Sequence, residues 1–471
     1  MASATANWWR CSSASSRRPP TRSGRRAARP AKARPRRRPG PMDADVKGLL
    51  PLPAPSLPLP RAAAAGLSRR GALALIASLA ACTDPDSSYR NRIDTGWHRD
   101  DLEALMLRWH KHAPQPDGSF QARFDRRWQP RAGDEVYLVD QARLVFSFAA
   151  AHEFIPDGGY LALAKRAASL MLMRFHDEVH GGYFHTISPD GRPKSVGKHA
   201  YDHAFVLLAL AELYRISGDV RFREAAQQAW LETERGFLDA HGGLHSECEQ
   251  DFKPRPGPRT QNPVMHMFEA LLLLRSASGD KVAETGARRL GDFVVNKLLQ
   301  GLPDGGALIP EWYDENWKPL ATKAEGGVID LGHQFEWTHL LTSGAVVSPI
   351  YAQVSERVLA YAMTIAYDEA EGGCATRAFP DGTAVDRRKG WWQQAECLHA
   401  LMVAAQASGR TDLWRRYEQT LALVKSQVVD AEQGGWRAAD ALPCKTGSCR
   451  DEQPEPYHMV RLHQTALRPV V

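Results

Sequence analysis

A Gly-Gly pair that closely follows an acidic residue recurs along this 471-residue chain at nearly constant intervals. The five pairs are Gly181-Gly182, Gly242-Gly243, Gly305-Gly306, Gly372-Gly373 and Gly434-Gly435. The intervals are 61, 63, 67 and 62 residues. A repeat of fixed period indicates a solenoid, a propeller or a closed array built from one structural unit.

Each interval contains two segments whose apolar residues have helical spacing. Between the first two pairs, residues 200–216 carry Phe205, Leu208 and Leu213 on one stripe, and residues 220–237 form a second segment that the next Gly pair ends. The repeating unit is therefore predicted to be an αα-hairpin.

Six such hairpins fit residues 98–471. The first two helices are expected near 101–112 and 134–155, and the last over 455–467. We predict an all-α fold, an (α/α)6 barrel (toroid) of six helical hairpins. Its even-numbered helices would line a central funnel, and its odd-numbered helices would shield them.

The segments after the Gly pairs are long and carry aromatic residues, such as Tyr183-Phe184, Trp312-Tyr313 and Trp436. Long loops in compact domains are usually functional, so we expect them to roof one mouth of the funnel. An open stack of helical repeats is the rival architecture, but its units would be shorter, about 34–47 residues.

The net positive charge of the chain comes from its first 70 residues. Residues 1–70 hold 16 Lys and Arg against two Asp, a net charge of +14, whereas the remainder carries −8. An acidic body excludes a phosphate-backbone binder, so no nucleic-acid partner is expected. We predict that residues 1–97 form a disordered Arg-rich leader and that residues 98–471 are the catalytic domain.

A probable export signal lies at about residues 66–82. Arg69-Arg70, a short apolar run over residues 71–81 and Cys82 resemble a twin-arginine signal that ends in a lipobox. This predicts a periplasmic or membrane-anchored lipoprotein attached only through a lipidated Cys82. The alternatives are an organellar transit peptide or a cytoplasmic protein, and translation from Met42 is compatible with export.

The seven cysteines form no zinc-binding pattern. Cys248, Cys374 and Cys397 are expected to be buried single thiols, and only Cys444 and Cys449 are close enough in sequence to pair locally. We predict neither a metal site nor a cofactor.

Conspicuous polar residues fall near the starts of the even-numbered helices. They are Arg143, His203, His266, Glu269, His333, Glu336, Glu396 and His458. In a toroid these helices point into one pocket, so the residues predict an acid/base constellation. The spacing i, i+3 puts His266 beside Glu269 and His333 beside Glu336. Taken singly, each is equally explained as a core histidine, a packing carboxylate or a structural ion-pair partner.

Five short motifs occur in a fixed order over residues 98–471. They are Gln141-Ala142-Arg143-Leu144, Ala200-Tyr201-Asp202-His203-Ala204-Phe205, Asn262-Pro263-Val264-Met265-His266-Met267-Phe268-Glu269-Ala270, Gly332-His333-Gln334-Phe335-Glu336-Trp337 and Pro456-Tyr457-His458. This ordered set resembles the motifs of the N-acylglucosamine 2-epimerase superfamily, at the branch that includes mannose isomerases and cellobiose 2-epimerases. The fold that the resemblance implies is again the (α/α)6 barrel.

The resemblance implies a carbohydrate isomerase or epimerase that interconverts an aldose with its ketose or C2 epimer through a cis-enediol. The mannose, fructose and glucose type is expected, with N-acyl-D-glucosamine 2-epimerase and cellobiose 2-epimerase as alternatives. His266 and His458 would be the acid/base pair and His203 would assist ring opening, while Arg143 would stabilise the oxyanion. The expected substrate-binding residues are Glu269, Glu336, His333, Asn262, Trp391, Trp392, Glu396 and Tyr137.

The expected partner is a monosaccharide or disaccharide, and the oligomeric state stays open, with a homodimer as one option. Two rival functions also fit the fold, which does not by itself fix the chemistry. A glycoside hydrolase or lyase would use two opposed carboxylates among Glu269, Glu336 and Glu396. A non-catalytic sugar-binding barrel would keep the aromatic residues without needing His458.

Overall fold

The structure is a computed structural model that describes residues 92–131, 133–320, 327–383, 385–437 and 451–468. The predicted signal at residues 66–82, including Cys82, and the Cys444–Cys449 pair lie outside these residues. None of the described helices is long and apolar enough to cross a membrane.

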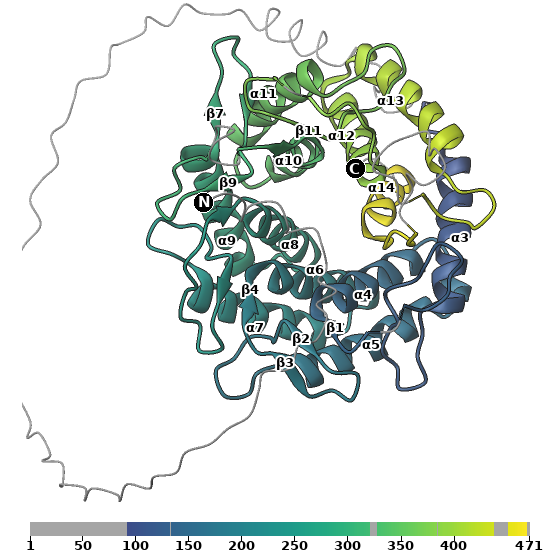
Figure 1. Cartoon of the computed structure of the whole chain (residues 1–471), viewed down its shortest axis with the longest axis vertical. Coiled ribbons are helices and arrows are strands. Elements are labelled where there is room, and N and C mark those ends of the chain that lie inside the picture. Colours follow the sequence, from purple (N-terminus) through teal and green to yellow (C-terminus); the bar gives the residue numbers. More distant parts are fainter. Residues whose placement is uncertain (1–91, 132, 321–326, 384, 438–450, 469–471) are drawn as a thin grey trace, which may run out of the picture. The chain divides into compact units, whose positions relative to one another are not determined.

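Within the residues that the structure describes, twelve α-helices form two concentric layers (Figure 1). The inner helices are α4 (Leu138–His152), α6 (Ala200–Ser217), α8 (Asn262–Ser278), α10 (Leu331–Gly344), α12 (Trp391–Ser408) and α14 (Tyr457–Leu467). The outer helices are α3 (Thr95–His112), α5 (Tyr160–Phe175), α7 (Val220–Phe237), α9 (Lys281–Phe293), α11 (Ile350–Ile365) and α13 (Thr411–Leu423). Helices α9 and α13 continue as π-helical turns, Val294–Leu298 and Val424–Val428, and a 3₁₀ turn, Pro156–Gly158, precedes α5.

The inner helices form a closed ring. Each packs against the next, and α14 packs against both α4 and the first outer helix, α3. In Figure 1 the yellow α14 accordingly lies beside the purple-blue α3. The predicted (α/α)6 barrel is confirmed.

Helix α3 begins at Thr95, so the predicted domain boundary at residue 97 lies inside this helix. The reason is a helix cap: the Asp94 carboxylate accepts a hydrogen bond from the Trp97 backbone N–H at 3.0 Å. This helix therefore starts slightly earlier than its apolar pattern indicates.

A buried hydrogen-bonded chain, which we name the closing seam, joins the first helix to the last. His98 Nδ1 lies 2.9 Å from His463 Nδ1, and His463 Nε2 lies 2.9 Å from Asp101 Oδ2. Tyr417 contributes its hydroxyl, 2.6 Å from His98 Nε2, and Trp436 Nε1 donates to Asp101 Oδ2 at 2.8 Å. The seam thus connects α3, α13 and α14 where the ring closes.

The two layers differ in composition for a physical reason. Every residue of α6 from Asp202 to Leu213 is buried, because an inner helix is covered on all sides by neighbours. The outer helix α7 buries only one face, which includes Phe222, Ala226 and Trp230. The buried cysteines Cys248, Cys374 and Cys397 are free thiols, as predicted.

The Gly-Gly repeat marks a loop that follows each of several outer helices. In the first copy the Asp177 N–H donates to the Gly182 carbonyl and the Gly181 N–H donates to the Asp177 carbonyl. Both glycines have positive φ, 78° and 70°, which residues with a Cβ rarely adopt. Lys198, two residues before the following inner helix α6, pairs with the Asp177 carboxylate at 2.9 Å. Asp368, Gly372, Gly373 and Lys389 repeat this arrangement.

Short strands brace the loops at the end of the ring where the inner helices begin. They pair antiparallel as β1–β2–β3, β4–β5, β6–β9, β7–β8 and β10–β11. Their bounds are Val136–Tyr137, Thr186–Ile187 and Pro193–Ser195 (β1–β3), Lys198–His199 and Glu247–Cys248 (β4, β5), Arg259–Thr260 (β6), Gln300–Gly301, Ala307–Leu308 and Trp312–Tyr313 (β7–β9), and Ile329–Asp330 and Arg377–Ala378 (β10, β11). At two or three residues each, they are too short to give an alternating sequence pattern.

Candidate active site

Five of the polar residues predicted from the sequence form one buried cluster. His266 and Glu269 come from α8, Glu336 from α10, Glu396 from α12 and His458 from α14, and none is more than 8% exposed. Polar atoms of His266, Glu269 and Glu336 lie within 4.8 Å of one another, and so do those of Glu336, Glu396 and His458. Glu336 therefore links two halves, each with one histidine and one further glutamate.

In the first half, the Glu269 carboxylate anchors His266. His266 Nδ1 lies 3.1 Å from Glu269 Oε2, and the Tyr457 hydroxyl donates to the same oxygen at 2.5 Å. Arg461 Nε lies 2.9 Å from Glu269 Oε1. Burial alone would raise the pKa of Glu269, but Arg461, His266 and Tyr457 hold it at about 2. Because an ionised carboxylate only accepts hydrogen bonds, His266 Nδ1 carries the proton and Nε2 keeps its lone pair.

Burial lowers the pKa of His266 to about 4, against the opposing influence of Glu269. The imidazole is therefore neutral at pH 7. A neutral imidazole with an available Nε2 lone pair is the form that a general base requires.

In the second half, Glu396 bridges two histidines. Its Oε1 lies 2.7 Å from His458 Nδ1, and its Oε2 lies 2.8 Å from His339 Nε2. Burial would raise the pKa of Glu396, but the hydrogen bonds from His339 and His458 hold it well below its usual range. His458 thus has the same orientation as His266, with Nδ1–H on a carboxylate and Nε2 outside that hydrogen bond.

Arg143 lies beside the first half. Its guanidinium contacts Glu455 Oε1 at 2.8 Å and the Tyr201 hydroxyl at 2.5 Å. The Tyr201 ring in turn lies 5.3 Å from the His266 ring. Burial works against the charge of Arg143, but Tyr201 and Glu455 raise its pKa above the usual value. The cluster therefore includes a permanent cation at its edge.

Comparison with known proteins identifies the chain. Residues 118–460 match the family described as N-acylglucosamine 2-epimerase (GlcNAc 2-epimerase). The chain belongs to this family. The recognition made from the five motifs is thereby confirmed.

Relatives within the family are similar over most of their length. A cellobiose 2-epimerase of Eubacterium cellulosolvens is 26% identical over 396 residues, which cover 76% of this chain and 94% of that protein. A D-mannose isomerase of Thermobifida fusca is 28% identical, with coverage of 76% and 90%. The crystal structure of a D-mannose isomerase superposes with a TM-score of 0.72 at 23% identity, over 80% of this chain and 98% of that one.

His203 lies outside the cluster, which corrects its predicted role in ring opening. The Tyr183 N–H donates to His203 Nε2 at 3.0 Å, and His203 Nδ1 lies 2.8 Å from the His199 carbonyl. Its ring packs 4.9 Å from that of Phe237, at the end of the outer helix α7. Backbone groups occupy both ring nitrogens of His203. This histidine therefore fixes the loop at Tyr183 to α6.

The predicted pairing of His333 with Glu336 is wrong. His333 Nδ1 lies 2.7 Å from Glu311 Oε1, in the loop that precedes α10. Burial would lower the pKa of His333, but Glu311 raises it. The Trp392 ring lies 5.1 Å from the His333 ring and 5.3 Å from the His458 ring, so His333 borders the cluster through Trp392.

The remaining predicted residues lie around the cluster or farther from it. The Trp391 ring lies 6.0 Å from that of His458. Asn262 is the first residue of α8, one turn before His266. Tyr137 donates its hydroxyl to Glu135 at 2.8 Å, and Arg123 stacks on its ring at 3.9 Å.

Sequence reasoning assigned no role to Tyr457, Arg461 or His339, although each contacts a cluster carboxylate. Tyr457 and Arg461 are spaced i, i+4 on α14 and converge on Glu269. That spacing beside His458 was the available signal. His339 lies one turn beyond Glu336 on α10.

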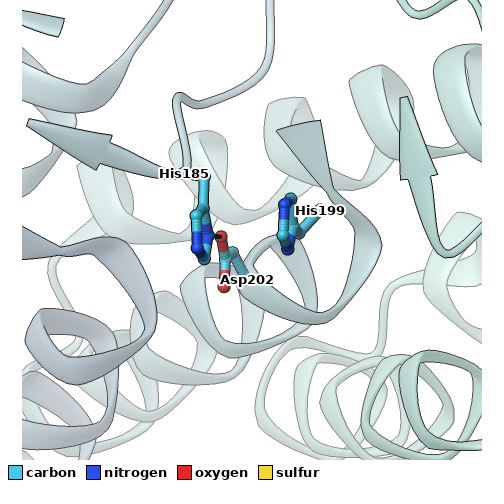
Figure 2. A group of neighbouring side chains, drawn as sticks. All are labelled: His185, His199 and Asp202. Carbon is cyan, nitrogen blue, oxygen red and sulfur yellow. Dashed lines mark hydrogen bonds and ion pairs between the residues drawn. The ribbon is translucent and has the colours of Figure 1, made fainter. Parts of the chain in front are cut away.

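A second group, His185, His199 and Asp202, lies at the start of α6 (Figure 2). His185 Nδ1 lies 2.6 Å from Asp202 Oδ2, which raises the pKa of His185 against the effect of burial. The His185 and His199 rings stack at 3.8 Å with planes only 5° apart. Parallel rings direct their in-plane lone pairs along parallel lines, so this arrangement suits an ion pair better than a metal ion shared by both rings.

Proposed function

We propose that the chain interconverts an aldose with its ketose or C2 epimer by proton transfer through a cis-enediol. One observation carries the proposal: two imidazoles in one cluster each present Nδ1–H to a carboxylate and keep Nε2 as an acceptor. The related cellobiose 2-epimerase and D-mannose isomerase support a mannose, glucose or fructose unit as substrate.

The chemistry follows from the weak acidity of a proton α to a carbonyl. The Nε2 atom of His266 or His458 takes the proton from C2, and the electron pair moves to the carbonyl oxygen. Arg143 stabilises the negative charge that develops on this oxygen, since a guanidinium stays charged throughout. Return of the proton to C1, together with transfer of the O2–H proton to O1, gives the ketose. Delivery of a proton to the opposite face of C2 by the second imidazole, protonated from solvent, while the C1 carbonyl re-forms, gives the epimer.

Solvent exchange tests the proposal. Mannose, glucose, fructose, cellobiose and N-acetylglucosamine are each incubated with the protein in D2O and followed by NMR and chromatography. We expect deuterium at C1 or C2 of at least one sugar, together with its isomer or epimer. Hydrolysis without deuterium uptake would support the glycoside hydrolase instead, and binding without either reaction would support a sugar-binding barrel.

The two single variants His266→Ala and His458→Ala then separate epimerase from isomerase. An epimerase with one base on each face of C2 keeps exchange of one epimer when the opposite base is lost. An aldose–ketose isomerase with a single base loses all exchange in one variant.

We also propose that the protein is exported and lipidated at Cys82, on the evidence of the leader sequence. Expression of the full chain with a radiolabelled fatty acid tests this. Label in the membrane fraction that Cys82→Ala abolishes supports the proposal, and an unprocessed, unlabelled chain in the cytoplasm contradicts it.

A further inference from the structure

The three cluster carboxylates differ in how their oxygens are satisfied. Glu269 accepts hydrogen bonds at Oε2 from His266 and Tyr457, and the Arg461 guanidinium balances its Oε1 as an ion pair at 2.9 Å without a hydrogen bond. Glu396 receives His458 and His339. Each of these two carboxylates is therefore surrounded by groups that donate hydrogen bonds to a negative charge.

Glu336 has no such surroundings. Within the described part of the chain, no group donates a hydrogen bond to its buried Oε2. Its Oε1 lies 3.7 Å from His266 Nδ1, which is beyond hydrogen-bonding distance and already engaged by Glu269. The Glu336 side chain is nevertheless only 2% exposed and lies between two ionised carboxylates.

A buried carboxylate without donors and beside two negative charges is strongly disfavoured. Burial, followed by Glu396 and Glu269, raises the pKa of Glu336 well above its usual range, and the more distant Arg143 and Arg461 offset only part of this. Either a proton or a bound cation must neutralise the site.

The donor set favours the proton. Glu269 and Glu396 are already committed to side-chain donors, and the histidine Nδ1 atoms face those carboxylates. Glu336 is then the only one of the three cluster carboxylates left to bind a cation. Zinc takes three or four protein or water ligands, and calcium takes six to eight oxygens.

We propose that Glu336 is a neutral carboxylic acid in the resting protein and acts as a third proton-carrying group, which donates a hydrogen bond to the substrate oxygen on C1 or C2. This rests on the proposed isomerase function. When His266 or His458 removes the proton from C2, the carbonyl oxygen gains the electron pair and the Glu336 O–H shares or transfers its proton to it. When the new carbonyl forms, the proton returns to Glu336, so the group is unchanged over a cycle. An ionised Glu336 would instead repel the enediolate.

Matched substitutions test the protonation state. Glu336→Gln keeps the size, neutrality and donor capacity of a carboxylic acid, so turnover should fall by less than about 10-fold. In Glu269→Gln the amide NH2 must face either the Arg461 guanidinium or the His266 N–H, and in Glu396→Gln it must face one of two imidazoles, so we expect losses of about 100-fold or more. Glu336→Ala removes the donor and should lose more activity than Glu336→Gln. An equal loss in all three Gln variants would overturn the proposal.

Two measurements test the protonation state of Glu336 without measuring turnover. They therefore distinguish failure of this proposal from failure of the proposed isomerase function. Infrared difference spectroscopy between wild type and Glu336→Gln at pH 7 should show the C=O band of a protonated carboxyl group, and its absence would contradict the proposal. Elemental analysis of the purified wild-type protein should find no stoichiometric metal. A bound metal that Glu336→Gln loses would show that a cation, and not a proton, neutralises the site.

Discussion

The catalytic cluster and the closing seam are both buried networks of histidine and carboxylate, yet they differ in what they leave unused. In the seam, the Tyr417 hydroxyl donates to His98 Nε2, His98 donates to His463, and His463 donates to Asp101, so all four ring nitrogens have protein partners. In the cluster, His266 and His458 each give only one nitrogen to a carboxylate. Burial and histidine content therefore do not distinguish the two networks, whereas an imidazole nitrogen with no protein partner among the described residues does.

The cluster variants His266→Ala and His458→Ala should show the largest effect. Each removes a positioned acid/base group, so we expect turnover to fall by about 10²–10⁴-fold. The midpoint of thermal unfolding should change little, because Glu269 keeps Tyr457 and Arg461 as partners and Glu396 keeps His339. Steady-state kinetics and circular dichroism measure both quantities. Retained turnover, or a variant that does not fold, would assign these histidines to the core.

The seam variant His463→Ala should show the opposite behaviour. It leaves His98 Nδ1 without its partner and removes one of the two donors to Asp101 Oδ2, so the free energy of unfolding should fall by about 3 kcal/mol. Turnover of the folded protein should stay within about twofold of wild type. Chemical denaturation measures the free energy of unfolding, and kinetics at low temperature measure turnover. The variant His241→Ala, at an exposed position, is a control that should change neither quantity.

Much of the cluster was predictable because its members occupy equivalent places in a repeat. His266, Glu269, Glu336, Glu396 and His458 stand near the starts of even-numbered helices, and closure of the ring brings such positions together. The seam was not predictable, since its two histidines lie 365 residues apart and meet only when the ring closes.

His203 and His333 show where the repeat argument ends. An equivalent position in the repeat places a residue at the same level along its helix. The direction of its side chain, however, depends on the rotation of 100° per residue. His203 points toward α7 and the loop at Tyr183, and His333 points toward Glu311. Loop partners of this kind come from irregular segments that carry no period.

The pH dependence of stability sharpens the comparison. Burial, reinforced by His463 and Lys425, lowers the pKa of His98 well below 6.5. The unfolded chain therefore takes up a proton below pH 6.5 that the folded protein does not, so stability is full above this pH and is lost as the pH falls. His98 should contribute a loss of about 1.4 kcal/mol per pH unit.

Denaturation of wild type and His98→Gln between pH 7.5 and about pH 5 measures this contribution. The difference between their free energies of unfolding should shrink by that amount for each unit below 6.5. A difference that is constant with pH would show that His98 does not titrate on unfolding. The contributions of the other buried histidines to the free energy of unfolding cancel, since both proteins contain them.

Tyr457→Phe should give the smallest effect. It removes one of the donors to Glu269 while His266 and Arg461 remain, so the orientation of His266 is largely kept. A single hydrogen bond to a charged group corresponds to about 1.5–3 kcal/mol at most, and we expect a loss of turnover of about 10-fold. A loss as large as that of His266→Ala would make Tyr457 itself an acid/base group.

Exchange of the sugar C2 proton in D2O tests the division of labour between the two networks most directly. The measurement compares wild type, the double variant His266→Ala/His458→Ala and the seam variant His463→Ala, each at equal concentration of folded protein. We predict deuterium uptake by wild type and by His463→Ala at similar rates, and none above the uncatalysed background by the double variant. Uptake that survives in the double variant, or that the seam variant alone abolishes, would contradict the assignment of catalysis to the cluster.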